Sequence, residues 1–292
     1  MQRSILPPPP RSAVERAVRT ALEEDLGRGD VTTESCVTSD QHGRAVVHAR
    51  EQLVLCGVEV VREVYRQVDP DVVVAAIAVD GARLAAGDEV VRLAGPAASL
   101  LSGERVALNF VQRLSGVATM ARRHVDAVPA GSPIRITDTR KTTPGLRALE
   151  RHAVRCGGAH NHRDDLAAAV LIKDNHIAAA GGVRAAVERA RHLAPHTSRI
   201  ECEVDTLEQL DEALDAGADV VLLDNFDDAR VAQAVDRARG RALVEASGGI
   251  SLERVGRLAA AGVDVISVGA LTHSAPAVDL GLDWITDALD RA

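Results

Sequence analysis

Lysine is almost absent from this chain of 292 residues. Among 34 basic side chains only Lys141 and Lys173 are lysines, and both lie within residues 138–176. Arginine is a planar fork on a long stem, whereas lysine is a compact point charge that can reach one oxygen in a tight pocket. The same segment holds four of the ten histidines. We therefore interpret residues 138–176 as a candidate anion-binding segment.

Aromatic residues are scarce too, and Tyr65, Phe110, Phe226 and Trp284 are all of them. Their scarcity argues against binding of single-stranded nucleic acid, which relies on base stacking. The net charge of −8 gives no broad attraction to nucleic acid or to an anionic membrane. No apolar run approaches the length of a membrane span, and the first twelve residues lack the apolar core of a signal peptide. We expect a soluble cytoplasmic protein with neither nucleic acid nor membrane as partner.

Cysteine is rare, and Cys36, Cys56, Cys156 and Cys202 show neither CxxC nor zinc-ligand spacing. Buried, reduced thiols are the expectation. His152 lies on a stretch with helical periodicity, and we interpret it as a packed or solvated side chain.

The first part of the chain mixes strand-like and helical runs. An amphipathic helix is expected over residues 12–25, a loop over residues 27–33, and a second helix over residues 58–68. Short β-like runs surround that second helix without a clean βα alternation, which indicates an α+β layer. A long helical pattern covers residues 97–127, and we place a domain boundary inside it, near Gly116. Residues 1–116 are therefore predicted to form a separate N-terminal domain.

The pattern changes after this boundary, and residues 117–275 are predicted to form an α/β barrel domain. Near-continuous apolar strands alternating with helices imply a parallel sheet covered by helices. Six strands are too few for the eightfold form, so we expect an incomplete TIM-like barrel. The tail, residues 276–292, has no seventh barrel strand and is expected to pack on the first domain. The six β-like runs cover residues 134–139, 168–174, 199–205, 218–225, 241–247 and 263–269.

Polar residues and glycines follow all six predicted strands, at the edge where parallel barrels carry their chemistry. The last two strand ends are rich in glycine, which lets backbone N–H groups approach an anion, and we interpret them as a phosphate cradle. Glu203 lies on the same side of its strand as Glu201. The strand ends are Asp138–Lys141, Lys173–His176, Glu201 and Glu203, Asp224–Asn225, Glu245–Gly249 and Gly269.

Positive groups gather at this edge, and their mutual repulsion is costly unless an anion lies between them. Glu203 and Asp224 are the acidic complement. They could hold ribose hydroxyls, a metal ion or a developing positive sugar carbon, or they could form an internal ion-pair network with the lysines. The cations are Arg140, Lys141, His162, Arg163 and Lys173.

Several motifs resemble the quinolinate phosphoribosyltransferase family, also called nicotinate-nucleotide pyrophosphorylase (carboxylating). They span nearly the whole chain: EDLGRGDVTT, GERVALNFVQRLSGVAT, TRKTTPGLR, NHR, LIKDNH, EVDTLEQ, LLDN, ASGGI and ISVGALTHS. The resemblance implies an α/β sandwich followed by an incomplete barrel that a dimer partner completes. One departure precedes NHR, where Gly157-Gly158-Ala159-His160 replaces a longer glycine run and adds a histidine beside the site.

The reaction that the resemblance implies joins quinolinate to 5-phosphoribosyl-1-pyrophosphate. It gives nicotinate mononucleotide, pyrophosphate and carbon dioxide, with Mg²⁺ as cofactor, in NAD biosynthesis. The active unit is then a homodimer in which Arg105 reaches the partner's site.

The resemblance also implies residue roles. Catalysis is assigned to Lys141, Glu203 and Asp224. Mg²⁺ is expected to bind mainly through the pyrophosphate of the substrate, with Glu203 and Asp224 as candidate protein ligands. Quinolinate binding is assigned to Arg105, Thr139, Arg140, Lys141, His162, Arg163 and Lys173. Phosphoribosyl pyrophosphate binding is assigned to Lys141, Lys173, Glu203, Asp224, Ser247, Gly248, Gly249, Val268, Gly269 and Ala270.

Three alternatives stay open. A phosphoribosyltransferase of the same architecture could act on a monocarboxylate such as nicotinate, and would not need the full set of cations. A Schiff-base aldolase could use Lys173 as its amine nucleophile. A non-catalytic relative could bind the same ligands for regulation or transport, although the intact acidic residues and lysines argue against it.

Overall fold

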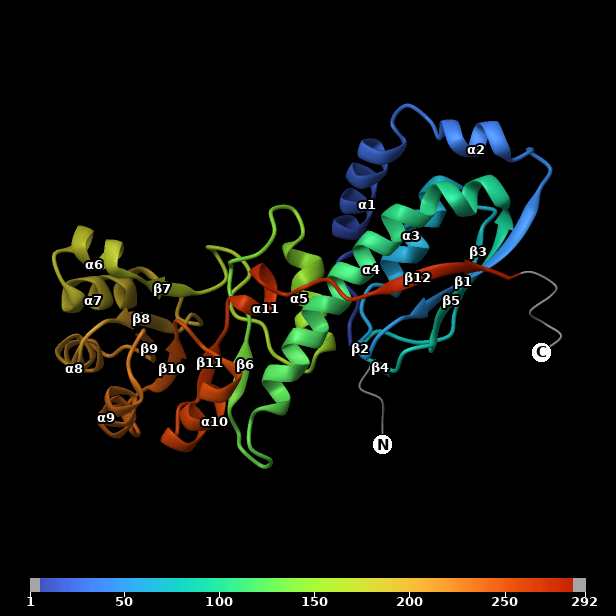
Figure 1. Cartoon of the computed structure of the whole chain (residues 1–292). Coiled ribbons are helices and arrows are strands. Elements are labelled where there is room, and N and C mark those ends of the chain that lie inside the picture. Colours follow the sequence, from blue (N-terminus) through green and yellow to red (C-terminus); the bar gives the residue numbers. More distant parts are fainter. Residues whose placement is uncertain (1–5, 286–292) are drawn as a thin grey trace. The chain divides into compact units, whose positions relative to one another are not determined.

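The computed structural model describes residues 6–285, and the chain divides into two compact units (Figure 1). Among these residues, the first unit comprises 6–122, 142–158 and 271–285, and the second comprises 123–141 and 159–270. Within the described residues no helix combines the length and the apolar character needed to cross a membrane.

The first unit is built on a four-stranded antiparallel sheet with the order β12-β1-β5-β3. The core of the unit consists mainly of aliphatic side chains, with Tyr65 and Phe110 as its aromatic members. The strands of this sheet are β1 (His42–Ala49), β3 (Val73–Ala76), β5 (Glu89–Pro96) and β12 (Leu280–Trp284). Two short strands, β2 (Leu53–Val54) and β4 (Arg83–Leu84), pair with each other in a separate sheet. The helices of the unit are α1 (Arg11–Leu26), α2 (Val31–Cys36), α3 (Val58–Val68), α4 (Ala97–Asp126), which continues four residues beyond the unit, α5 (Arg147–Cys156) and α11 (Ala270–His273), which begins one residue before it.

The expected helices over residues 12–25, 58–68 and 97–127 are present as α1, α3 and α4. The loop expected over residues 27–33 is wrong in its second half, because α2 begins at Val31. Asp30 is the N-cap of α2, and its carboxylate accepts the backbone N–H of Thr33 at 3.0 Å. This N-cap satisfies a free helix donor and outweighs the weak helical pattern of six residues.

Strand β12 lies in the C-terminal tail and pairs antiparallel with β1 of the first unit. It is no part of the barrel sheet, as expected for the tail, although it forms a strand that the sequence reading did not assign. Residues 286–292 of the tail lie outside the described part of the chain.

The second unit contains a six-stranded parallel sheet with the order β6-β11-β10-β9-β8-β7. All six expected barrel strands are present. In the described residues β6 and β7 are the two edge strands of the sheet and do not pair with each other, which leaves the barrel open. Helices α7 to α10 follow one another along one side of the sheet (Figure 1). The strands are β6 (Arg135–Thr137), β7 (Val170–Ile172), β8 (Ile200–Val204), β9 (Val220–Asp224), β10 (Leu243–Ser247) and β11 (Val265–Ser267). The helices are α6 (Asp174–Ala180), α7 (Val183–Leu193), α8 (Leu207–Asp215), α9 (Asp228–Ala238) and α10 (Leu252–Ala261).

The segment between β6 and β7 differs from the expected division at Gly116, because residues 142–158 group with the first unit. Glu150 on α5 is completely buried there and accepts hydrogen bonds from Arg113 Nη2 at 2.8 Å and from Thr143 Oγ1 at 2.8 Å. A buried carboxylate needs such partners to offset its lost hydration, and these partners hold α5 against α4.

Candidate active site

A cavity of about 230 Å³ lies at the carboxyl ends of the strands in the second unit. Strand alternation points every second side chain of β8, β9 and β10 to this side, and the parallel register sets neighbouring strand ends side by side. Nine of the predicted site residues line it: Thr139, Arg140, Lys141, His162, Arg163, Lys173, Glu203, Asp224 and Ser247. Leu171, Leu222, Glu245 and Ser267 line it as well.

One of the interactions left open by the sequence, an ion pair between a lysine and a strand carboxylate, is present. Lys173 Nζ forms an ion pair and hydrogen bond with Glu203 Oε2, across neighbouring strands β7 and β8. Asp224 ends β9, where its Oδ2 accepts a hydrogen bond from the Asn225 side chain at 2.8 Å. An internal ion pair and a substrate-binding role are compatible, because a bound anion can replace Glu203 as the partner of Lys173.

His162 is held from two sides. The buried Asp138 accepts the His162 backbone N–H at 2.7 Å and the Asn161 side-chain amide at 2.6 Å, which fixes the NHR segment beside β6. His162 Nε2 lies 3.3 Å from Glu201 Oε2 and 3.5 Å from Glu245 Oε2. Hydrogen bonds to these two carboxylates raise the pKa of His162 to about 10. This rise predicts an imidazolium at neutral pH.

One contact opposes that charge. The Arg163 backbone N–H approaches His162 Nδ1 at 2.8 Å, and only an unprotonated Nδ1 can accept it. A neutral hydrogen bond contributes about 1 kcal/mol. A rise in pKa from 6.5 to about 10 corresponds to about 5 kcal/mol in favour of the charged ring. Burial, together with Glu245, raises the pKa of Glu201 as well, so this carboxyl competes with the ring for a proton. We assign the imidazolium form because two carboxylates face the one His162 nitrogen.

The two guanidinium groups at the cavity add to this charge. Burial and the nearby Arg140 lower the pKa of Arg163, a sign that the two cations repel each other. Arg163 Nη1 also donates to the Ala169 carbonyl at 3.1 Å, which orients the group at the cavity. Like charges held together in this way favour an anionic ligand.

The glycine-rich loop after β10 packs tightly against the end of β9. Gly248 and Gly249 have φ angles of 83° and 56°, and a side chain on Gly248 would place its Cβ 2.1 Å from Asn225 Oδ1. Asn225 itself has a φ of 55°, which is uncommon outside glycine. Backbone strain of this kind concentrates at ligand-binding loops.

The remaining predicted residues have other positions. Gly248, Gly249, Val268, Gly269 and Ala270 directly follow the cavity-lining Ser247 and Ser267 but do not line the cavity. Val268 cannot serve as a phosphate donor as expected, because its backbone N–H donates to the Thr137 carbonyl at 3.0 Å and so completes the β6–β11 ladder.

Arg105 lies on α4 in the first unit, where its side chain is exposed. His160 does not line the cavity either. Its side chain is exposed while its backbone forms an isolated parallel bridge with Thr137 of β6, so the departure from the glycine run adds no histidine to the cavity.

Sequence reasoning assigned no role to Glu201 and Glu245, the two buried carboxylates that hold His162. Strand alternation could have identified them. Glu201 precedes Glu203 by two residues and Glu245 precedes Ser247 by two residues, so each shares a face with an assigned residue.

Comparison with known proteins agrees with this geometry. Residues 117–283 match the family model for the C-terminal domain of quinolinate phosphoribosyl transferase, and residues 30–115 match the model for its N-terminal domain. The chain belongs to the quinolinate phosphoribosyltransferase family.

Relatives in this family are similar over most of their length. A probable nicotinate-nucleotide pyrophosphorylase (carboxylating) of Bacillus subtilis is 44% identical, with 89% of each chain covered. The Mycobacterium leprae nicotinate-nucleotide pyrophosphorylase is 44% identical, with 93% of this chain and 97% of the relative covered. The solved Francisella tularensis nicotinate-nucleotide pyrophosphorylase has a TM-score of 0.89 at 38% identity and covers 96% of this chain and 99% of its own.

The fold by itself is shared more widely. Human nicotinic acid phosphoribosyltransferase superposes with a TM-score of 0.63 at 16% identity. A likeness of this kind establishes architecture and not substrate, so the choice of substrate has to be argued from the site.

Proposed function

We propose that this chain transfers the phosphoribosyl group of 5-phosphoribosyl-1-pyrophosphate to quinolinate, with decarboxylation. The products are nicotinate mononucleotide, pyrophosphate and carbon dioxide, as in the de novo synthesis of NAD. One observation carries the proposal: a single cavity is lined by five basic side chains and by the strand-end carboxylates Glu203 and Asp224. The basic side chains are Arg140, Lys141, His162, Arg163 and Lys173.

Quinolinate carries two carboxylates on adjacent ring carbons, and this charge suits the cationic side of the cavity. Arg140 and Arg163 are forks that can hold a carboxylate through two hydrogen bonds. The charged His162 and Lys173 add two further donors, and Thr139 adds a hydroxyl. A monocarboxylate such as nicotinate would leave part of this charge unmatched, which favours quinolinate as the substrate.

Glu203 and Asp224 suit the sugar. When pyrophosphate leaves, positive charge develops at the anomeric carbon, and a carboxylate fixed nearby stabilises it. The same two carboxylates offer the oxygen ligands that Mg²⁺ prefers, and they suit an ion that keeps waters and substrate phosphate oxygens in its shell. Mg²⁺ would neutralise the leaving pyrophosphate. Lys141, at the end of the segment after β6, serves both substrates.

The phosphate at the 5-position of the sugar suits the loops that follow the last two strands. Ser247, Gly248 and Gly249 follow β10, and Gly269 and Ala270 follow β11. Glycine in these loops permits backbone N–H groups to approach the phosphate oxygens. Val268 is left out of this set because its N–H is already bonded.

Decarboxylation follows transfer. The ring nitrogen attacks the anomeric carbon, pyrophosphate leaves, and the ring becomes a cation. The adjacent carboxylate then leaves as carbon dioxide, its bonding electrons are stabilised by the cationic ring, and the ring carbon takes up a proton. This sequence requires no strong base on the protein.

The active unit is proposed to be a homodimer in the cytoplasm, with Arg105 of one chain completing the quinolinate site of the other. Support comes from the exposed position of Arg105 on α4 and from the implied family pattern. The free thiols of Cys56, Cys156 and Cys202 suit a reducing compartment.

The deciding experiment compares two acceptors. Purified chain is incubated with 5-phosphoribosyl-1-pyrophosphate and Mg²⁺, and pyrophosphate release is measured with quinolinate or with nicotinate. We expect release and carbon dioxide with quinolinate alone. Turnover of nicotinate without turnover of quinolinate would disprove the assignment. Borohydride treatment with a carbonyl substrate is expected to leave Lys173 unmodified, which removes the aldolase alternative.

A further inference from the structure

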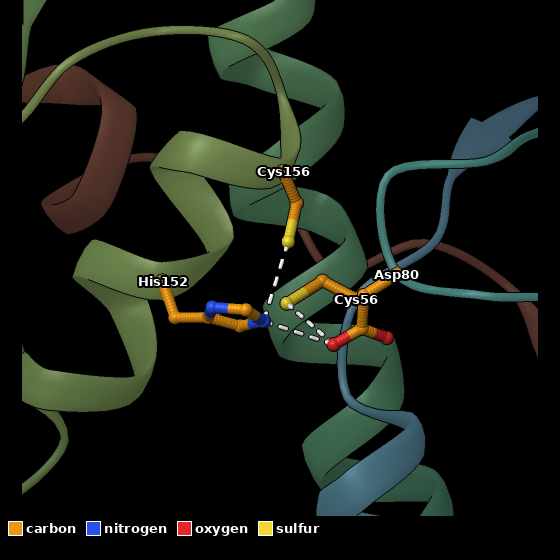
Figure 2. A group of neighbouring side chains, drawn as sticks. All are labelled: Cys56, Asp80, His152 and Cys156. Atoms are coloured by element: carbon orange, nitrogen blue, oxygen red, sulfur yellow. Dashed lines mark hydrogen bonds and ion pairs between the residues drawn. The ribbon is translucent and has the colours of Figure 1, made fainter. Parts of the chain in front are cut away.

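Four side chains with metal-binding atoms meet in the interior of the first unit, outside the cavity described above (Figure 2). They are Cys56, Asp80, His152 and Cys156. Their donor atoms all lie within 4.8 Å of one another. Three separate segments supply them: the residues before α3, the loop between β3 and β4, and helix α5.

The distances between donor atoms suit a tetrahedron. His152 Nε2 lies 3.0 Å from Asp80 Oδ2 and 3.4 Å from Cys156 Sγ, and Cys56 Sγ lies 4.0 Å from Asp80 Oδ2. Zinc bonds of about 2.0 to 2.3 Å at tetrahedral angles place donor atoms about 3.3 to 3.8 Å apart. Each of the three distances therefore lies within a few tenths of an ångström of that range. Small side-chain shifts are enough to complete the geometry.

The surrounding backbone holds these donors in place. Asp80 Oδ1 accepts the N–H groups of Gly57 and Val58 at 2.9 and 3.0 Å, which leaves Oδ2 directed at the imidazole and at Cys56. Gly57 has a φ of 119°, a conformation open to glycine, and this allows the chain to turn into α3 directly after Cys56. Hydrogen bonds that orient ligands in this way are typical of metal sites.

Cys56 and the helical pair are equally fixed. The backbone N–H of Cys56 donates to Ser115 Oγ at 3.0 Å, and the same hydroxyl donates to the Cys56 carbonyl at 3.2 Å. His152 and Cys156 lie four residues apart on α5 and therefore share one face of the helix. Both side chains point toward Cys56 and Asp80 in Figure 2.

The cluster is buried and unusually polar for its position. Cys56 is fully buried, and His152 and Cys156 are 4% and 6% exposed. A metal ion bound here would take the place of the protons on the two thiols and on His152 Nε2.

Arg155 lies next to the cluster, and its positive charge offsets the charge of an occupied site even when its guanidinium turns away from His152. Two thiolates and a carboxylate around a divalent cation leave one net negative charge, and Arg155 Nη2 lies 3.4 Å from His152 Nδ1. When Nε2 binds a metal, Nδ1 carries a proton and the guanidinium has to turn from it. Arg155 Nη2 already donates to the Pro7 carbonyl at 3.2 Å, which gives it an alternative partner.

We propose that Cys56, Asp80, His152 and Cys156 form a structural zinc site. Two sulfur ligands, one nitrogen and one oxygen select zinc over magnesium or calcium, which prefer oxygen alone. Four protein ligands close the coordination sphere, which is typical of a structural and not a catalytic ion. The ion would fasten α5 to the rest of the first unit. A cavity of about 490 Å³ reaches Asp80 and His152 and provides a route of entry.

Cobalt(II) substitution tests the site in the full chain. Untagged protein is reduced with a phosphine, stripped with a chelator and titrated with Co²⁺. We expect one ion per chain, with the intense visible bands of tetrahedral cobalt and a near-ultraviolet thiolate charge-transfer band, both abolished by added Zn²⁺. Zinc should also raise the melting temperature in a concentration-dependent manner. Absence of the charge-transfer band in reduced protein would overturn the proposal.

Variants locate the site. Cys56→Ser and Cys156→Ser are expected to weaken zinc binding by more than about 100-fold, because each removes a direct ligand. Cys202→Ser removes a buried thiol of the second unit and should bind cobalt as the parent chain does. Equal binding by all three variants would place the ion elsewhere.

Alkylation gives an answer even if a serine variant does not fold. Because Cys56 and Cys156 are buried, the chain is alkylated in mild denaturant, where zinc should slow their labelling by iodoacetamide in a peptide map. The exposed Cys36 is labelled equally with or without metal. Unchanged labelling of Cys56 and Cys156 contradicts a zinc site. The zinc site is also contradicted if Cys56 and Cys156 are isolated as a disulfide and the protein binds no metal once that disulfide has been reduced.

Discussion

The charge of His162 can be tested by removing one of the two carboxylates that stabilise it. Glu245→Gln keeps the shape of the side chain and its capacity to accept a hydrogen bond, but removes the negative charge 3.5 Å from His162 Nε2. Glu201 remains, 3.3 Å from the same nitrogen. The substitution therefore separates the electrostatic effect of one carboxylate from the packing of the site.

The magnitude follows from the two nearly equal distances. The pKa of His162 is raised from 6.5 to about 10, and hydrogen bonds to two carboxylates cause the rise. Loss of one carboxylate should remove about half of the effect, roughly 2 kcal/mol, and bring the pKa of His162 to roughly 8. The folded pKa exceeds the unfolded one, so the stabilisation is fully present below pH 6.5 and is lost as pH rises through the folded pKa.

Two measurements follow the pKa of His162. Nitrogen NMR of the labelled imidazole reports its protonation directly, and the KM for quinolinate should rise above a pH of roughly 8 in Glu245→Gln but only near 10 in the parent chain. Glu208→Gln removes an exposed carboxylate and should leave both profiles unchanged. A neutral imidazole at pH 7 in the parent chain would refute this assignment. It would show that the hydrogen bond from the Arg163 backbone N–H to His162 Nδ1 outweighs the two carboxylates.

The remaining predictions concern the glycine loop, the buried glutamate and the proposed dimer. Gly248→Ala should raise the KM for 5-phosphoribosyl-1-pyrophosphate at least about tenfold, because the new Cβ would lie 2.1 Å from Asn225 Oδ1 and its φ is unfavourable for alanine. Glu150→Ala should lower the free energy of unfolding by about 2 to 3 kcal/mol, measured in denaturant, since Arg113 and Thr143 lose their hydrogen bonds to a fully buried carboxylate. Mixed dimers of Arg105→Ala with Lys141→Ala chains should regain activity through one intact site.

Each of these has a matched control. Gly256→Ala adds a methyl group on α10 with no atom from outside the surrounding helix backbone within 4 Å, and should leave the KM unchanged. Glu188→Ala removes a glutamate with 60% of its side chain exposed and should cost little stability. Placing both substitutions, Arg105→Ala and Lys141→Ala, in one chain and mixing it with itself should give no recovery. Inactive mixtures despite confirmed heterodimers would contradict a shared site.

The resemblance to a family carried the residue roles, but most of the cavity could be predicted from local pattern. The ends of parallel strands meet at one edge of the sheet, so periodicity alone placed Lys173, Glu203 and Asp224 together. The cavity contains them. The local pattern could not show that Glu201 and Glu245 contact His162. Strand alternation predicts on which face of the sheet a side chain lies, but not which residue from another segment it contacts. The sequence pattern does not predict the short helix α2, because six residues show too little periodicity and the helix depends on its N-cap, Asp30.

The four ligands of the proposed zinc site illustrate what sequence leaves open. Cys56 and Cys156 are separated by a hundred positions and show no metal-binding spacing, and His152 was interpreted as a packed or solvated side chain. In the structure His152 is buried and hydrogen-bonded to Asp80. Cys36, expected to be buried with the others, is exposed.

The sequence by itself determined the two-part α/β organisation, the six parallel strands and the edge at which the charged residues gather, because strand period and parallel direction are local properties. Tertiary structure alone decided which charges touch. The imidazolium of His162 and the cluster at Cys56 depend on side chains that packing brings together from distant parts of the sequence, and the hydrogen bonds formed there raise the pKa of His162.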